Sequence, residues 1–144
     1  MVDILHRIGV KDVTPEVAYQ TIATRDGIAS WWIGETSGDD AVGGTLDFGA
    51  DIKARVAELR PGQHIDWEVI EGPDEWIGTH ITFDIKQDGD YTIILLKHQG
   101  WSEPVEFMHH CSTKWGVFML SLKQLLETGT GAPTPHDTLI DNWS

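Results

Sequence analysis

The chain has 144 residues, of which 40% are hydrophobic, and carries a formal charge of −13 at pH 7. This length and composition predict one folded domain with its own hydrophobic core. The negative charge repels phosphate groups and anionic lipids, so neither a nucleic-acid nor a membrane partner is expected. The single cysteine, Cys111, excludes an intramolecular disulfide and a cluster of several zinc-bound thiolates. Since no apolar run reaches about 18 residues and no leader pattern is present, we expect a cytoplasmic location.

The first segment, 2–11, alternates between apolar and polar side chains, which is typical of a half-buried strand. His6 falls on its apolar side, where it either bonds a neighbouring group or faces a ligand. The sequence Thr-Pro-Glu at 14–16 then supplies a capping hydroxyl, a first-turn proline and an acidic side chain. A helix is therefore predicted over 15–24.

A second short helix is predicted over 26–32, and it ends in Trp31 and Trp32. Either one of these tryptophans anchors the helix to the sheet, or the pair forms part of a lid near a pocket. The segment 33–43 is rich in glycine, serine and aspartate, so we expect a loop there.

Short strands fill the middle of the chain, and the turn sequences at 60–62 and 88–90 favour antiparallel hairpins. The last strand is apolar on both faces, so it is expected to be central or covered by another element. The predicted strands are 44–50, 52–60, 63–71, 76–87 and 90–100. The side chains expected to share one face are Val56, Ile65, Trp67, Val69, Ile81, Phe83 and Ile85.

The segment 102–129 is predicted to be a long amphipathic helix around which the sheet is organised. Ser102 and Pro104 resemble a cap and a first-turn residue, and Gly129 is a natural stop. At about 100° per residue, one broad apolar stripe forms. The stripe consists of Phe107, Met108, Cys111, Trp115, Phe118, Met119, Leu122, Leu125 and Leu126, and the polar face contains His110, Thr113, Lys114, Ser121 and Gln124.

The remaining residues, 130–144, are predicted to form an extended tail on a single domain of residues 1–129, with Trp143 as an anchor. Val117 and Leu120 fall on the polar side of the long helix. They indicate a small apolar contact there, either the seat of the tail or the surface of a homodimer.

Six stretches of the sequence, taken in their order and spacing, resemble one known family. They are Thr14-Pro15-Glu16 with Tyr19 and Ile22, Ile28-Ala29-Ser30-Trp31-Trp32, Gly43-Gly44-Thr45-Leu46-Asp47-Phe48, Val56-Ala57-Glu58-Leu59-Arg60-Pro61 running into Ile65-Asp66-Trp67, Thr92-Ile93-Ile94-Leu95-Leu96-Lys97-His98-Gln99-Gly100-Trp101, and Trp115 with Leu122, Leu125 and Leu126. The resemblance is to homologues of the activator of heat-shock-protein-90 ATPase, within the START/SRPBCC superfamily of birch-pollen-allergen-like domains. It implies an α+β helix-grip fold, in which a curved antiparallel sheet of about six or seven strands wraps around a long C-terminal helix. Two short helices follow the first strand.

The resemblance also implies a role, because members of this superfamily that act bind lipids, hormones, polyketides or other hydrophobic molecules between sheet and helix. The family has no universal catalytic motif. The co-chaperone activity of its eukaryotic members involves additional sequence, for which a chain of 144 residues is not expected to have room.

A pocket is therefore expected between the sheet and the long helix, lined by aromatic and flexible apolar side chains that serve equally as core. Cys111 is expected to be a buried apolar residue and not a nucleophile. The predicted lining residues are Trp32, Trp67, Phe83, Ile94, Leu96, His98, Met108, Cys111, Trp115, Phe118 and Met119.

The histidines do not predict a metal site. Successive helical residues point about 100° apart, so His109, His110 and Cys111 are not expected to share one ion. His98 lies at the end of the last strand, on the apolar side, where it either bonds a nearby backbone carbonyl or offers one nitrogen to a ligand. No cofactor and no catalytic residue are predicted.

Three functions agree with these patterns. The first is binding of a small hydrophobic molecule in the pocket. The second is an enzyme, a cyclase, dehydratase or hydrolase that acts on an aromatic or polyketide-like substrate, with His98 or an acid as proton carrier. The third is a co-chaperone-like or other protein-interaction module that uses its acidic surface.

Overall fold

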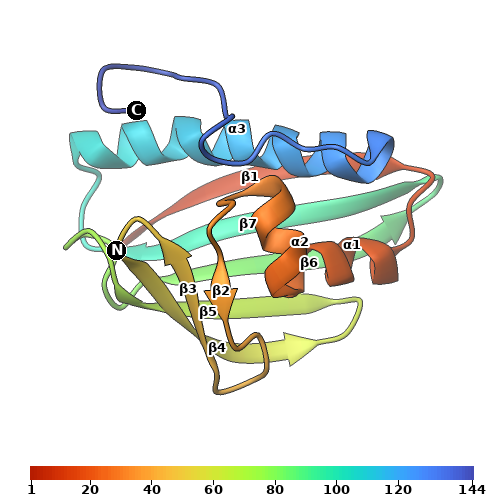
Figure 1. Ribbon diagram of the computed structural model, residues 1–144, viewed down its shortest axis with the longest axis horizontal. Coiled ribbons are helices and arrows are strands. Elements are labelled where there is room, and N and C mark those ends of the chain that lie inside the picture. Colours follow the sequence, from red (N-terminus) through yellow and green to blue (C-terminus); the bar gives the residue numbers. More distant parts are fainter.

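The computed structural model describes residues 1–144 and contains one seven-stranded antiparallel sheet and three helices (Figure 1). The strand order is β1-β7-β6-β5-β4-β3-β2. The strands are β1 (Val2–Lys11), β2 (Ser37–Gly38), β3 (Thr45–Gly49), β4 (Ile52–Arg60), β5 (His64–Glu71), β6 (His80–Asp88) and β7 (Tyr91–Trp101), and the helices are α1 (Pro15–Ala23), α2 (Arg25–Trp31) and α3 (Glu106–Thr128). The sheet curves around α3, which confirms the helix-grip fold.

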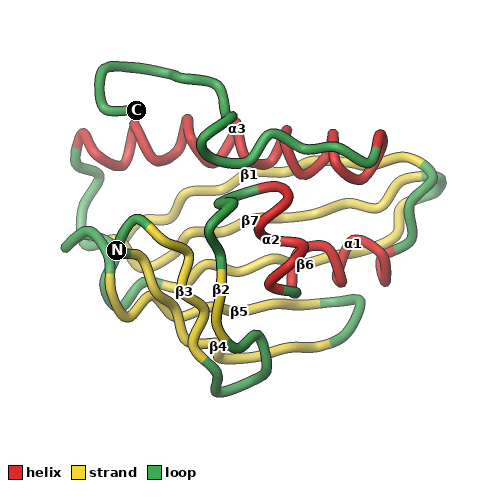
Figure 2. The backbone as a smooth tube through the Cα atoms, viewed as in Figure 1, coloured by secondary structure: helices red, strands yellow, loops and turns green.

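The helices lie on the inner face of the sheet (Figure 2). Their apolar residues belong to the same core cluster as the inward side chains of the strands. The seven side chains expected to share one face are all buried in this cluster. β7 pairs with β1 on one side and β6 on the other, which confirms its central position. None of the helices is both long and apolar enough to cross a membrane.

Local sequence explains both short helices. The Thr14 hydroxyl accepts a hydrogen bond from the Val17 N–H at 3.2 Å, so it caps α1 as predicted. The Thr24 hydroxyl does the same for the Gly27 N–H at 3.1 Å and caps α2. Each cap satisfies a backbone donor that has no partner within its helix.

The predicted start of the long helix is wrong by four residues. α3 begins at Glu106, and Val105 occupies the cap position without a side-chain hydrogen bond. The reason is that β7 continues to the buried Trp101, so the chain needs the intervening residues to turn from the sheet into the helix. The predicted stop is confirmed, because Gly129 has a left-handed backbone with φ of 89°.

Two strand predictions also differ from the structure. β6 begins at His80 and not at residue 76, because a turn precedes it in which the Trp76 N–H donates to the Pro73 carbonyl at 2.9 Å. The predicted loop 33–43 contains the two-residue strand β2, which pairs with β3. The backbone hydrogen bonds of β2 are made with β3, so the sequence of 33–43 alone does not predict this short edge strand.

The tail, residues 130–144, runs back along α3 toward its N-terminal end (Figure 1). The Ala132 N–H donates to the Ser121 hydroxyl at 2.8 Å, and Thr134 forms a parallel bridge with Ile33. Near the other end of α3, the Trp143 ring centroid lies 5.2 Å from that of His110. The tail therefore covers His110 and Ser121, which the helical pattern places on the polar face.

Gly27 is required by packing and not by backbone conformation. A Cβ added to Gly27 would lie 2.1 Å from the Thr21 carbonyl oxygen, whereas one added to Gly116 would lie 3.5 Å from the nearest atom, His6 Cε1. We expect Gly27→Ala to lower the free energy of unfolding by about 1–3 kcal/mol, because a backbone atom blocks the methyl group. Gly116→Ala should raise it by up to about 1 kcal/mol through helix propensity. Urea denaturation of both variants tests the pair, and equal effects would contradict the clash.

Candidate functional site

Aromatic side chains fill the space directly between the sheet and α3. The Trp67 ring is stacked 6.2 Å from Trp32 and lies edge-on 5.2 Å from Phe83. The Trp115 ring of α3 lies 4.9 Å from Trp32. Trp67 and Phe83 are fully buried, so this part of the interior is packed core.

A cavity of about 380 Å³ lies beside this core, between α3 and the tail. Its other walls come from the residues after α2, the turn between β5 and β6, and the start of β4. Nine of its 16 lining residues are hydrophobic. The aromatic part of the wall consists of Trp32, Trp76, Phe107, Trp115 and Phe118.

The cavity and the predicted pocket share only part of their residues. Those common to both are Trp32, Cys111, Trp115 and Phe118. The predicted residues that do not line the cavity are Trp67, Phe83, Ile94, Leu96, His98, Met108 and Met119. Met108 instead lines a smaller depression of about 260 Å³ next to β1. Trp32 forms part of the wall, because it is buried and stacked on Trp67.

The lining residues that sequence reasoning missed lie mostly in segments without regular secondary structure. They include Ile33, Trp76, Thr134, Pro135, Asp137 and Leu139. Helical or strand periodicity does not describe such segments, and only the return path of the tail brings them to α3. The apolar side chains and prolines of the tail are the one signal that indicates a docked segment.

His98 belongs to a buried hydrogen-bond network below the cavity. The Trp115 indole N–H donates to His98 Nδ1 at 3.1 Å. Since this nitrogen accepts, the neutral ring carries its proton on Nε2, which lies 2.8 Å from the Thr79 hydroxyl oxygen. The Thr79 hydroxyl in turn donates to the Trp76 carbonyl. His98 thus ties the strand end to a backbone carbonyl through one threonine.

This network excludes His98 as a proton carrier at neutral pH. Burial lowers the pKa of His98 to about 3, because the charged imidazolium loses its hydration. A proton on Nδ1 would also face the Trp115 N–H, so two donors would meet. Both nitrogens are occupied, and the side chain has no exposed surface.

Cys111 lines the cavity as a protonated thiol. Burial raises the pKa of Cys111 to about 12, so the thiolate that acts as nucleophile is not formed at neutral pH. The indole N–H of Trp76, another lining residue, is buried and has no hydrogen-bond partner. The cavity wall therefore contains one poorly satisfied donor.

Two basic side chains of α3 face the tail and are paired with its carboxylates. Lys114 donates to Asp137, and both side chains are largely buried, with exposed fractions of 14% and 7%. One turn away, His110 Nδ1 lies 2.7 Å from Asp141 Oδ2. The hydrogen bond from His110 lowers the pKa of Asp141. These pairs hold the tail across the cavity.

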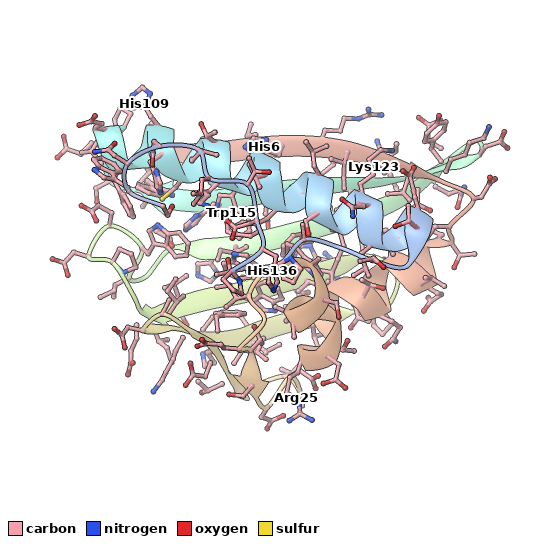
Figure 3. The ribbon with its side chains drawn as sticks, turned by 45° about the horizontal axis from the view of Figure 1, so that its top comes forward. His6, Arg25, His109, Trp115, Lys123 and His136 are labelled. Carbon is pink, nitrogen blue, oxygen red and sulfur yellow. The ribbon has the colours of Figure 1, made fainter.

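The other histidines lie apart from the cavity. His6 Nε2 lies 3.3 Å from the Ser112 hydroxyl. Of the two alternatives predicted for His6, a bond to a neighbouring group is therefore the one observed. Figure 3 shows His109 pointing away from the sheet, whereas Trp115 lies on the side of α3 that faces the sheet. On strands β4 and β5, Glu58, His64 and Asp66 place ligand atoms within 4.8 Å of one another. These three residues could hold a metal ion, but they do not line the cavity.

Comparison with known proteins identifies the family of this chain. A family model described as "Activator of Hsp90 ATPase homolog 1-like protein" matches residues 12–127, most of the sequence. The chain belongs to this family. The membership confirms the resemblance seen in the sequence, and no curated protein matches the chain.

Solved structures support the same assignment. The Aha1 dimer from Colwellia psychrerythraea is 39% identical, with a TM-score of 0.81 over 91% of this chain and 100% of that chain. CalU16 from Micromonospora echinospora is 19% identical, with a TM-score of 0.74 over 92% of this chain and 77% of that chain. SSP2350 from Staphylococcus saprophyticus is 18% identical, with a TM-score of 0.75 over 90% and 95% of the two chains. The last two show that this chain shares their fold.

Proposed function

We propose that this protein binds a small hydrophobic molecule in the cavity between α3 and the tail. The observation that carries the proposal is the cavity itself, about 380 Å³ in volume and lined mainly by aromatic and aliphatic side chains. Volumes of roughly 300–1,000 Å³ with apolar walls and few polar groups are typical of ligand sites. The polar groups here are concentrated on the side of the tail.

The arrangement supports binding more than turnover. His98 is held neutral by two hydrogen bonds, and Cys111 remains a thiol at neutral pH. A general base must reach the proton it removes, and a nucleophile must be ionised or activated. His98 has no free nitrogen for a general base, and Cys111 is not ionised as a nucleophile must be. The interaction-module hypothesis stays a prediction.

The hydrophobic dye N-phenylnaphthylamine provides a direct test, read as its fluorescence increase on titration with the protein. We expect saturable binding of one dye per chain, weakened about five- to tenfold by Leu139→Asp. Leu139 lines the cavity but is 77% exposed, so the substitution puts a charge at the ligand without disturbing the core.

Leu120→Asp is the matched control. Leu120 is also exposed, at 62%, but it lies on the outer side of α3 and does not line the cavity. The same change of side chain and charge should leave the dye affinity within about twofold. Equal losses in both variants, or no saturable binding to the unmodified chain, would count against the proposed site.

A homodimer is also supported, because the relative from Colwellia psychrerythraea is described as a dimer in solution. Light scattering coupled to size exclusion should then give about twice the 16.1 kDa of one chain. A mass of one chain at all concentrations would contradict the dimer without affecting the cavity proposal.

A further inference from the structure

Besides the Asp137 carboxylate, the apolar wall of the cavity contains one lysine ammonium, that of Lys114. It lies 5.6 Å from the centroid of the Phe118 ring, and its side chain is only 14% exposed. Its partner is Asp137 of the tail, which is buried even further, at 7% exposed. A cation in such surroundings needs an anion beside it, because its own desolvation is costly.

The tail supplies that anion as part of the covering of the cavity. Asp137 pairs with Lys114, and Asp141 pairs with His110 one helical turn away. In this contact the basic side chains, Lys114 and His110, belong to α3, and the two carboxylates belong to the tail. A ligand that enters by moving the tail therefore uncovers Lys114 and separates it from Asp137.

We infer that the ligand of this cavity is an amphipathic anion, whose carboxylate or sulfonate replaces the Asp137 carboxylate on Lys114 while its hydrophobic body packs against the aromatic wall. The tail is then an internal competitor that presents the same kind of group. This inference rests on the proposed function and names the ligand class of the same site.

A second observation agrees with an oxygen-bearing head group. The indole N–H of Trp76, a residue of the cavity wall, is buried and has no hydrogen-bond partner. An oxygen of a ligand that displaces the side chains around this donor would supply the acceptor that it lacks. A purely hydrocarbon ligand would satisfy neither Trp76 nor Lys114.

Two dyes with the same aromatic skeleton separate the charge from the hydrophobic body. Anilinonaphthalene sulfonate carries the anion, and N-phenylnaphthylamine lacks it. The readout is the ratio of their association constants, which we call the anion preference. A change in cavity shape alters the association constants of both dyes, so its effect cancels in the ratio.

Asp137→Asn removes the competing carboxylate and leaves Lys114 free, so the anion preference should rise about tenfold. The double variant Lys114→Met/Asp137→Asn removes both charges without leaving one buried alone. Its anion preference should fall at least about tenfold below that of Asp137→Asn. The control is Lys123→Met, since Lys123 pairs with Glu127 on the same helix and does not line the cavity.

A measurement on the unmodified chain keeps the inference testable if a variant fails to fold. Decanoate and decanol have the same chain length, and decanoate should displace bound N-phenylnaphthylamine at about tenfold lower concentration. Equal potency of the two competitors, or an anion preference that is the same in all variants, would overturn the inference while leaving a neutral-ligand site. Absence of binding by both dyes would instead refute the proposed function.

Discussion

Lowering the pH from 7 to 4.5 should remove about 2–3 kcal/mol of stability through His98 alone. The pKa of His98 is about 3 in the folded chain, whereas an unfolded chain has the ordinary value of 6.5. Between these two values the unfolded state binds a proton that the folded state does not. The contribution of His98 to stability is therefore complete above pH 6.5 and is lost progressively as the pH falls toward 3.

The measurement is urea denaturation of the unmodified chain and of His98→Gln between pH 4.5 and 7. Glutamine does not titrate, so the free energy of unfolding of the variant should depend less steeply on pH. Its absolute stability will be lower because a flexible amide does not reproduce the geometry of the two hydrogen bonds that the imidazole ring makes to Trp115 and Thr79, but the difference in slope is the readout.

His109→Gln is the control for this experiment, because it makes the same change of side chain at an exposed position of α3. Its removal should leave the pH dependence nearly unchanged. If His98→Gln and His109→Gln gave equal slopes, the neutral buried state of His98 would be wrong.

Trp67→Ala should lower the free energy of unfolding by about 3–5 kcal/mol. Trp67 is fully buried, and its ring contacts Trp32, Phe48 and Phe83. Removing an indole from the middle of this aromatic group leaves a cavity that the neighbouring rings cannot fill, because they are held from both the sheet and the helices. Thermal or urea denaturation measures the loss.

Added indole should partly restore the stability of Trp67→Ala, because the space left behind has the shape and apolar lining of the lost side chain. The same concentration of indole should shift the unmodified chain less. Trp143→Ala in the tail is the comparison, since Trp143 is 49% exposed and its loss should cost about 1 kcal/mol or less. Tolerance of Trp67→Ala would mean that the space between sheet and α3 is open and not packed.

The local patterns account for most of the fold. Apolar periodicity in α3 correctly predicts that residues such as Met108 and Trp115 are buried, because one helix has one face toward the sheet. Alternation correctly predicts the inward face of β5 and β6, since a change of one residue in register would expose the entire set. The cap of α1 is equally local, as Thr14 needs only the Val17 N–H three residues away.

The errors occur where one segment depends on another far along the chain. The start of α3 is displaced because Trp101 is held in the core by the end of β7. His110 and Ser121 lie on the polar face of the helix by spacing, yet the tail covers them both. Spacing along one helix contains no information about what docks on its outer side.

The sequence by itself determined the fold class, the core-facing side of each element and the family, because short-range periodicity and turn chemistry decide these properties. Only the tertiary structure decided the location of the cavity. The space between the sheet and α3 is filled because the rings of Trp32, Trp67 and Phe83 pack against one another. This packing depends on the relative positions of residues that are distant in the sequence. The pairing of Lys114 with Asp137 likewise depends on the return path of the tail, which joins residues that local patterns treat separately.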